Sequence, residues 1–178
     1  NKISITLKDS TVINGFGRIK IDERILFRKS EDAEKEFYDH KTVEKLTIYN
    51  DDSEQNYKYK AVEGSIEIGT IKLLEIIKIG KINLYQDYKS GMSYGPNMTG
   101  GGYGFTSYSK TTYYISESEA DTVTNLRIGN TYSKRFRKKI APKYFSDCSE
   151  LMNKINSKEF FNRYGIKSVV DYYNEKCE

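Results

Sequence analysis

Two cysteines are the residues whose type and position most clearly predict covalent chemistry. Cys148 lies at the start of one predicted C-terminal helix and Cys177 at the end of another. If these helices pack antiparallel, the two thiols come together, and a disulfide closing a loop of about 30 residues would stabilise the fold by about 3–4 kcal/mol. Such a bond predicts an oxidising compartment. A pair of free thiols in a reducing compartment is the alternative.

The other reactive side chains form no recognisable catalytic or metal-binding motif. His40 is the sole histidine and has no nucleophile and orienting acid in a catalytic pattern, so we interpret it as a turn residue. Two Cys and one His are too few for a structural zinc site. The acidic run at Asp51, Asp52 and Glu54 lacks the EF-hand pattern and its glycine. We therefore predict no catalytic residue, no cofactor and no metal.

A stretch rich in glycine and tyrosine, residues 89–110, is the most distinctive part of the chain. Gly91 to Gly104 includes six glycines, but the Gly-Lys-Ser/Thr ending of a phosphate-binding loop does not follow. We therefore predict a flexible loop. Aromatic residues separated by glycine can form an adaptable contact surface. The candidate partner-binding residues are Tyr94, Tyr103, Phe105 and Tyr108.

Alternation of apolar and polar residues predicts that residues 1–130 form a β-rich body. Ile3, Ile5 and Leu7 alternate with polar residues, as in a strand with one buried face. Two apolar arms flank Gly80-Lys81, which is a candidate hairpin turn, with a bulged continuous strand as the alternative. We predict eight to ten short strands in an antiparallel meander that forms a barrel or a sandwich.

Two further features of this body predict local irregularity. Gly15 and Gly17 lie inside the strand expected from Thr11 to Lys20, where they predict a bulge or tight bend. The segment His40–Leu46 is compatible with one helical turn, with Val43 and Leu46 facing inwards.

The chain changes character near residue 130, where helical periodicity begins. Apolar residues recur at intervals of four: Phe136, Ile140 and Tyr144. This spacing predicts an amphipathic helix that Pro142 should end or bend. Ser146 or Asp147 can cap a second helix, and Ile166–Lys176 reads as a third. The predicted fold is α+β and mainly β, with a tail of two to three helices at 131–178 packed on the body as one folding unit.

Composition and charge argue against several classes of function. The 178 residues include 16 tyrosines, which favours β structure, and no apolar run approaches the length of about 18 residues that a membrane span needs. The net charge of +4 is uneven, since residues 131–178 carry 11 Lys and Arg against 6 Asp and Glu. These basic residues are not interleaved with stacking aromatics, so we interpret them as a solvated helix face rather than a nucleic-acid site.

Several segments of the body and tail carry motif-like residues. They are Leu73–Glu75 with Gly80–Tyr85, Thr112–Ile115, Tyr144–Cys148 with Leu151, and Val169–Asn174 with Cys177. Together they resemble a family of exported proteins of unknown function from Gram-negative bacteria, with a β-rich body and a "YFSDC…YN…C" helical ending. The family has Pro where this chain has Ser149. The resemblance implies a signal peptide, periplasmic or cell-surface residence and the disulfide, and it implies no catalytic residue.

Three functions are compatible with these features. We expect a non-enzymatic binding or accessory module of the cell envelope, a candidate subunit of an outer-membrane protein complex, whose partner is another envelope protein. A carrier of a lipid or small apolar ligand inside a β-barrel is the first alternative. A hydrolase using Glu75 or Asp87 is the second, although both read as solvent-facing strand residues. We expect no nucleic-acid partner and no transmembrane span, with peripheral membrane association left open.

Overall fold

The fold is mainly β, with three helices at the C-terminal end. The computed structural model describes residues 1–178 except 52, 64–69, 97–101, 128–132, 161–164 and 178. The strands are β1 (Lys2–Leu7), β2 (Val12–Ile19), β3 (Ile25–Arg28), β4 (Glu36–Tyr38), β5 (Val43–Asn50), β6 (Ser53–Glu63), β7 (Ile71–Lys78), β8 (Ile82–Pro96), β9 (Tyr103–Glu117) and β10 (Thr122–Arg127). A π-helical turn (Phe136–Ile140) precedes α1 (Ala141–Phe145), α2 (Ser149–Asn156) and α3 (Gly165–Lys176). These elements confirm the predicted fold class.

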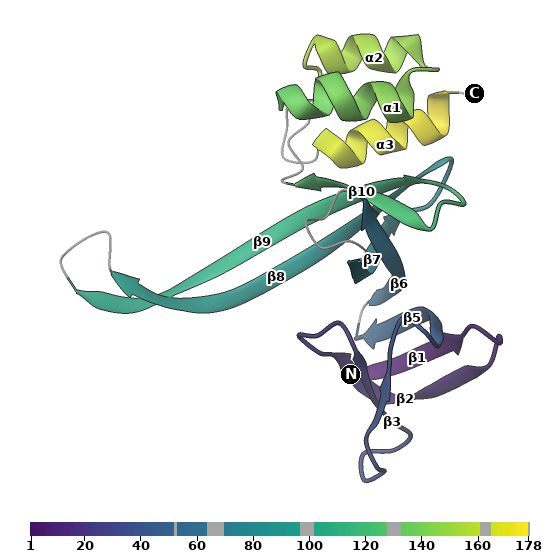
Figure 1. Cartoon of the computed structure of the whole chain (residues 1–178), viewed down its shortest axis with the longest axis vertical. Coiled ribbons are helices and arrows are strands. Elements are labelled where there is room, and N and C mark those ends of the chain that lie inside the picture. The colour runs from purple at the N-terminus through teal and green to yellow at the C-terminus, as the bar shows by residue number, and fades with distance from the viewer. Residues whose placement is uncertain (52, 64–69, 97–101, 128–132, 161–164, 178) are drawn as a thin grey trace.

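Strand β6 joins two β substructures. The strand order is β10-β9-β8-β7-β6-β5-β1-β2-β3-β4, and β10 also pairs with β6. The first half of β6 pairs with β5, whereas its last residues, Ala61 to Glu63, pair in parallel with β10. The strands β6 to β10 therefore close into a five-stranded barrel, and β1 to β5 continue as an open sheet below it (Figure 1). Of the two predicted architectures, barrel and sandwich, the structure has a barrel, to which an open sheet is added.

The barrel interior is filled by a small apolar core. Four buried side chains form this core: Leu74, Tyr85, Tyr114 and Val123. The partly buried Val62 and Ile76 pack against it. Residues next to them along the strands point outwards, because successive strand side chains alternate between faces. Leu73, for example, belongs to the core of the open sheet while Leu74 belongs to the barrel. Two consecutive residues of β7 are therefore apolar, because the two faces of this strand border two different cores.

The open sheet packs closely at two glycines. The pairing of β2 with β1 and with β3 runs without a register shift, so the bulge predicted at Gly15 and Gly17 is wrong. A Cβ at Gly15 would lie 2.2 Å from the Arg28 carbonyl oxygen, and one at Gly17 would lie 2.2 Å from that of Leu26. The glycines therefore permit close approach of neighbouring atoms in the paired strands. The predicted turn at His40–Leu46 is shorter than expected: the Val43 N–H donates to the Asp39 carbonyl oxygen at 3.0 Å, but Val43 already begins β5.

The helices cover the outer face of the barrel at β8, β9 and β10 (Figure 1). Phe136, Ile140 and Tyr144 are all buried, as their spacing predicts. Pro142 lies at the start of α1, directly after the π-helical turn, so it begins a helix rather than ending one. The N-cap of α2 is Cys148, which corrects the predicted caps. Among the described residues, no helix has both the length and the apolarity to cross a membrane.

The strands β8 and β9 form a long ribbon. The ribbon begins after the predicted hairpin, because β7 and β8 pair antiparallel across Gly80-Lys81. The alternative, one continuous bulged strand, is therefore wrong. The predicted loop at 89–110 is instead mostly strand, paired without interruption from Ile82↔Glu117 to Pro96↔Tyr103. Residues 97–101 of that prediction lie outside the described part of the chain. One aromatic side chain supports this ladder directly, since the Tyr108 ring lies against Gly91 of the neighbouring strand.

Candidate functional site

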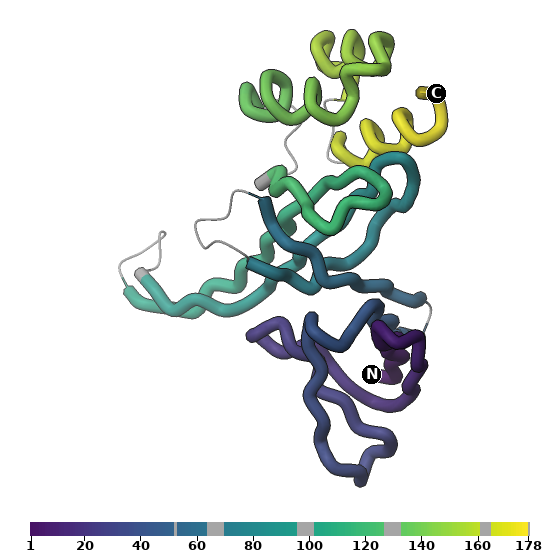
Figure 2. The backbone as a smooth tube through the Cα atoms, turned by 45° about the vertical axis from the view of Figure 1, so that its right-hand side comes forward, coloured from purple at the N-terminus to yellow at the C-terminus, as the bar shows by residue number. Residues whose placement is uncertain are grey.

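The outer half of the β8–β9 ribbon projects away from the barrel. It extends from the body in both views, with its free end far from the helices and from the open sheet (Figures 1 and 2). β7 pairs with β8 only up to Gln86, and β10 pairs with β9 only from Tyr113 onwards along its sequence. Beyond those points neither edge of the ribbon pairs with another strand among the described residues. An isolated two-stranded ribbon has marginal stability in water, so its own side chains must support it.

One face of the ribbon is aromatic and carries no charge. Cross-strand partners share a face, and Tyr94 lies opposite Phe105. The Tyr94 ring centroid lies 5.0 Å from that of Phe105 and 5.9 Å from that of Tyr103. We call this surface the aromatic face; its large side chains, which are 59–76% exposed, are Tyr88, Met92, Tyr94, Tyr103 and Phe105. The smaller residues on it are Ser90, Ser107, Ser109 and Thr111.

The structure brings three of the four predicted binding residues together. Tyr94, Tyr103 and Phe105 form the end of the aromatic face. Tyr108 lies on the opposite face, where its ring covers Gly91: a Cβ there would lie 2.8 Å from the Tyr108 hydroxyl. The sequence prediction missed Tyr88 and Met92, although the period-2 spacing of residues 88, 92 and 94 would have placed them on one strand face.

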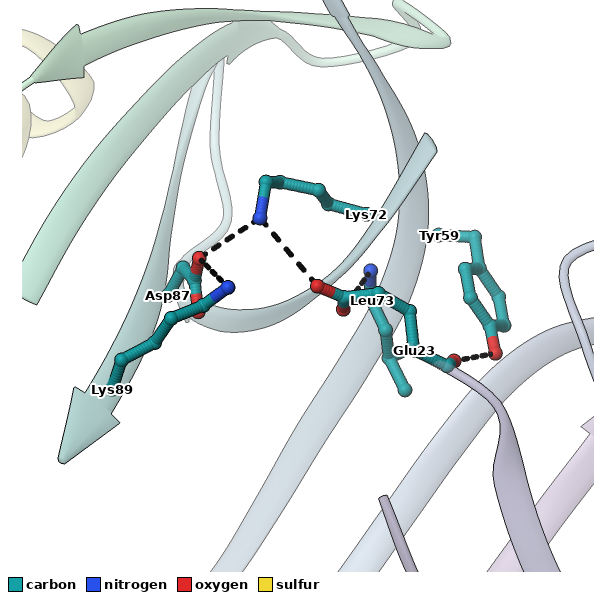
Figure 3. Close-up of polar contacts among 6 residues, drawn as sticks. All are labelled: Glu23, Tyr59, Lys72, Leu73, Asp87 and Lys89. Atoms are coloured by element: carbon teal, nitrogen blue, oxygen red, sulfur yellow. Dashed lines mark hydrogen bonds and ion pairs between the residues drawn. The ribbon is translucent and has the colours of Figure 1, made fainter. Parts of the chain in front are cut away.

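A charged network occupies the point where the ribbon leaves the barrel. The Lys72 ammonium lies 3.1 Å from an Asp87 carboxylate oxygen and 3.5 Å from a Glu23 oxygen, and Lys89 approaches Asp87 at 3.7 Å (Figure 3). Burial is the largest single influence and disfavours the charged form of Lys72, but the hydrogen bond to Asp87 and the negative charges of Asp87 and Glu23 together outweigh it, so the pKa of Lys72 is raised. Lys72 is therefore a permanent cation at neutral pH.

Glu23 holds the open sheet against the barrel. It has a φ of 65°, in the left-handed region that costs a non-glycine residue about 1–2 kcal/mol. Its carboxylate accepts a hydrogen bond from the Leu73 backbone N–H at 3.1 Å, where β8 no longer pairs with β7. Its carbonyl oxygen accepts one from the Tyr59 hydroxyl at 2.5 Å (Figure 3). These contacts offset the strain and define one wall of a cleft of about 730 Å³ beside the ribbon base.

The two carboxylates considered for hydrolysis lie in different environments. Glu75 lines the cleft and accepts hydrogen bonds from the Gln55 and Gln86 amides at 3.2 and 2.8 Å. Glu75 is opposite Gln86 in register, so Asp87 points to the other face of the sheet. Both carboxylates are partly buried and engaged in polar contacts, which corrects the prediction that they simply face solvent. Their placement on opposite faces does not form a paired acid and base.

The cysteines and the histidine lie away from the ribbon and have structural surroundings. Cys148 and Cys177 form a disulfide with a Cα–Cα distance of 5.7 Å, which ties the start of α2 to the end of α3. His40 lies at a turn, with its ring against Tyr59. Within the described ranges, no three His, Cys, Asp or Glu side chains come together as metal ligands would.

Comparisons with protein-family models, curated proteins and solved structures gave no match.

Proposed function

We propose that the protein is a non-enzymatic binding module that uses the aromatic face of the ribbon to dock a partner protein of the bacterial envelope. The observation that carries the proposal is the exposure of Tyr94, Tyr103 and Phe105, which are 64%, 72% and 73% exposed on a projecting element. Large aromatic side chains supply much of the binding free energy in protein interfaces, because they bury wide areas with few rotatable bonds. A cluster of three is a surface that a partner would bury.

The partner expected from this geometry is an apolar protein surface bordered by an extended strand. The aromatic face is uncharged, so it suits a partner surface that is also uncharged. The backbone edges of the outer ribbon, at Lys89–Gly95 in β8 and Gly104–Lys110 in β9, face no strand of the described chain. A strand from the partner can add to either edge, and its side chains then contact the aromatic face.

The envelope location rests on two supports. The disulfide is typical of proteins that fold in oxidising compartments. The resemblance of Tyr144–Cys148 and Val169–Asn174 to an exported Gram-negative family points to the same compartment. We therefore propose a periplasmic or cell-surface protein, a candidate subunit of an outer-membrane complex.

The barrel interior argues against the alternative of a ligand carrier. Leu74, Tyr85, Tyr114 and Val123 are all at most 3% exposed and fill the space between the strands. A carrier of this kind instead needs an interior cavity large enough to bury most of its ligand. The ribbon is therefore the better-supported site.

The test compares variants of the two ribbon faces. A double variant, Tyr94→Ser with Phe105→Ser, removes the aromatic pair, and Ser93→Ala with Thr106→Ala is the matched control on the opposite face. Affinity purification from the native envelope identifies candidate partners, and the purified partner is then titrated against each variant. We expect the aromatic variant to bind at least about 30-fold more weakly and the control to bind normally. Equal binding by both variants, with folding intact, would contradict the proposal.

A further inference from the structure

The barrel opens into a second cleft on the opposite face of the ribbon base. This cleft of about 490 Å³ is lined by residues of β7, β8, β9 and β10. We call it the barrel mouth; its lining residues are Lys72, Asp87, Lys89, Lys110, Thr112, Tyr114 and Asn125. Three cations, two hydroxyl groups and an amide thus surround one carboxylate at the end of the barrel core.

Two of the cations lie directly opposite each other. Lys89 and Lys110 are cross-strand partners in the β8–β9 ladder, an arrangement that is destabilising for like charges. Lys89 approaches Asp87 at 3.7 Å, but Asp87 already pairs with Lys72 at 3.1 Å. Lys110 makes no ion pair within the described part of the chain. Counting Glu23, which lies 3.5 Å from Lys72, the group still keeps one positive charge in excess.

The hydroxyl group of a largely buried tyrosine faces the same cleft. Tyr114 is only 2% exposed, yet it lines the barrel mouth. Its hydroxyl group makes no hydrogen bond to another described residue, and because no fully buried side-chain oxygen of the described residues is left unpaired, this hydroxyl group reaches the open cleft. Burial raises the pKa of Tyr114, so the phenol is protonated and able to donate at neutral pH.

We propose that the barrel mouth binds an oxyanion of the phosphate class. The Tyr114 hydroxyl donates from the floor of the cleft, Thr112 from its wall, and the Lys89 and Lys110 ammonium groups from its rim. The anion removes the repulsion between the two lysines and accepts a hydrogen bond from the Tyr114 hydroxyl group. Asp87 stays bound to Lys72 and holds it at the edge of the site. This proposal stands independently of the aromatic face.

The probe for the test is inorganic phosphate, titrated into ¹⁵N-labelled protein while amide NMR shifts are recorded. We expect saturable shifts centred on Lys72, Lys110, Thr112 and Tyr114. Lys110→Gln and Tyr114→Phe should each raise the dissociation constant by about fivefold or more, because each removes one donor to a charged acceptor. Lys138→Gln makes the same charge change on an exposed helix surface and should leave binding unchanged. Both site variants retain most of the side-chain volume, and their amide spectra report folding.

Two further measurements identify the source of the phosphate and separate the barrel-mouth proposal from the aromatic-face proposal. Sedimentation with phosphatidylglycerol vesicles, compared with phosphatidylcholine vesicles, tests a lipid headgroup. Binding that Lys110→Gln removes assigns a headgroup, and phosphate binding without vesicle binding assigns a free phosphate compound. The Tyr94→Ser, Phe105→Ser double variant should bind phosphate normally. Shifts that do not saturate, that lie away from the barrel mouth, or that weaken equally in Lys138→Gln would overturn the proposal.

Discussion

At the scale of single residues, Gly17 sets how closely the strands of the open sheet approach one another. Its backbone lies between the Leu26 carbonyl oxygen of β3 and the Ile3 side chain of β1. A Cβ at this position would lie 2.2 Å from that oxygen and 2.4 Å from the Ile3 Cδ1 atom. Ile3 is buried in the core of the sheet, so it has little room to move.

We predict that Gly17→Ala lowers the free energy of unfolding by about 2–3 kcal/mol, because the added methyl group overpacks the sheet. The measurement is urea unfolding followed by circular dichroism. Gly95→Ala is the control: it lies in β8, and no atom would lie within 4 Å of its added Cβ. A Gly17 variant as stable as the Gly95 variant would show that the sheet can adjust.

At the scale of elements, one side chain fixes α3 against the β7–β8 hairpin. The Asn174 Oδ1 accepts a hydrogen bond from the Ile82 N–H at 2.9 Å, and its Nδ2 donates to the Ile82 carbonyl oxygen at 2.9 Å. Gly80 leaves the space that this contact needs, since a Cβ there would lie 2.5 Å from the Asn174 Cγ. The side chain thus satisfies both backbone groups of the first residue of β8.

Asn174→Ala should lower the free energy of unfolding by about 2–3 kcal/mol, because it removes two hydrogen bonds and leaves partly buried backbone groups unpaired. Thermal and urea unfolding measure the change. Glu175→Ala, at the exposed neighbouring position of α3, should change stability by less than about 0.5 kcal/mol. Similar losses in both variants would mean that α3 is held by its apolar face alone.

At the scale of the whole molecule, one polar cluster joins the closed barrel to the helices. Glu63, at the end of β6, accepts hydrogen bonds from the Thr124 hydroxyl of β10 at 2.7 Å and the Lys143 ammonium of α1 at 2.9 Å. The Tyr144 hydroxyl lies 2.7 Å from that of Thr124. The hydrogen bonds from Thr124 and Lys143 hold the pKa of Glu63 below its ordinary value.

This depressed pKa predicts a pH-dependent contribution to stability. A carboxyl group with a lowered folded-state pKa stabilises the fold above its unfolded pKa, and the contribution disappears as pH falls through the folded value. Because Glu63 is half exposed, we expect Glu63→Gln to lose at most about 1 kcal/mol near neutral pH. The difference from the unsubstituted protein should shrink towards zero as unfolding is measured at increasingly acidic pH. A difference that stays constant would contradict the linkage.

The sequence predicted the elements better than their arrangement. Period-2 alternation around Ile3 and Ile5 and the four-residue spacing of Phe136, Ile140 and Tyr144 specified buried faces, because those periods are properties of strands and helices. From the sequence alone, the glycines at 15, 17 and 91 were predicted to mark a bulge, a bend or a flexible loop. Only their neighbours, the Leu26 carbonyl oxygen and the Tyr108 ring among them, show that they permit close contact in regular strands.

By itself, the amino-acid sequence determined the mainly β class, the helical tail and the position of the cysteines in that tail. The tertiary structure decided that β6 serves two sheets, that the predicted loop is a ribbon, and that Tyr94, Tyr103 and Phe105 share a face while Tyr108 does not. The barrel mouth also exists only in three dimensions. Periodicity is local and can be read along the chain, whereas strand register and barrel closure depend on pairing between residues far apart in the sequence.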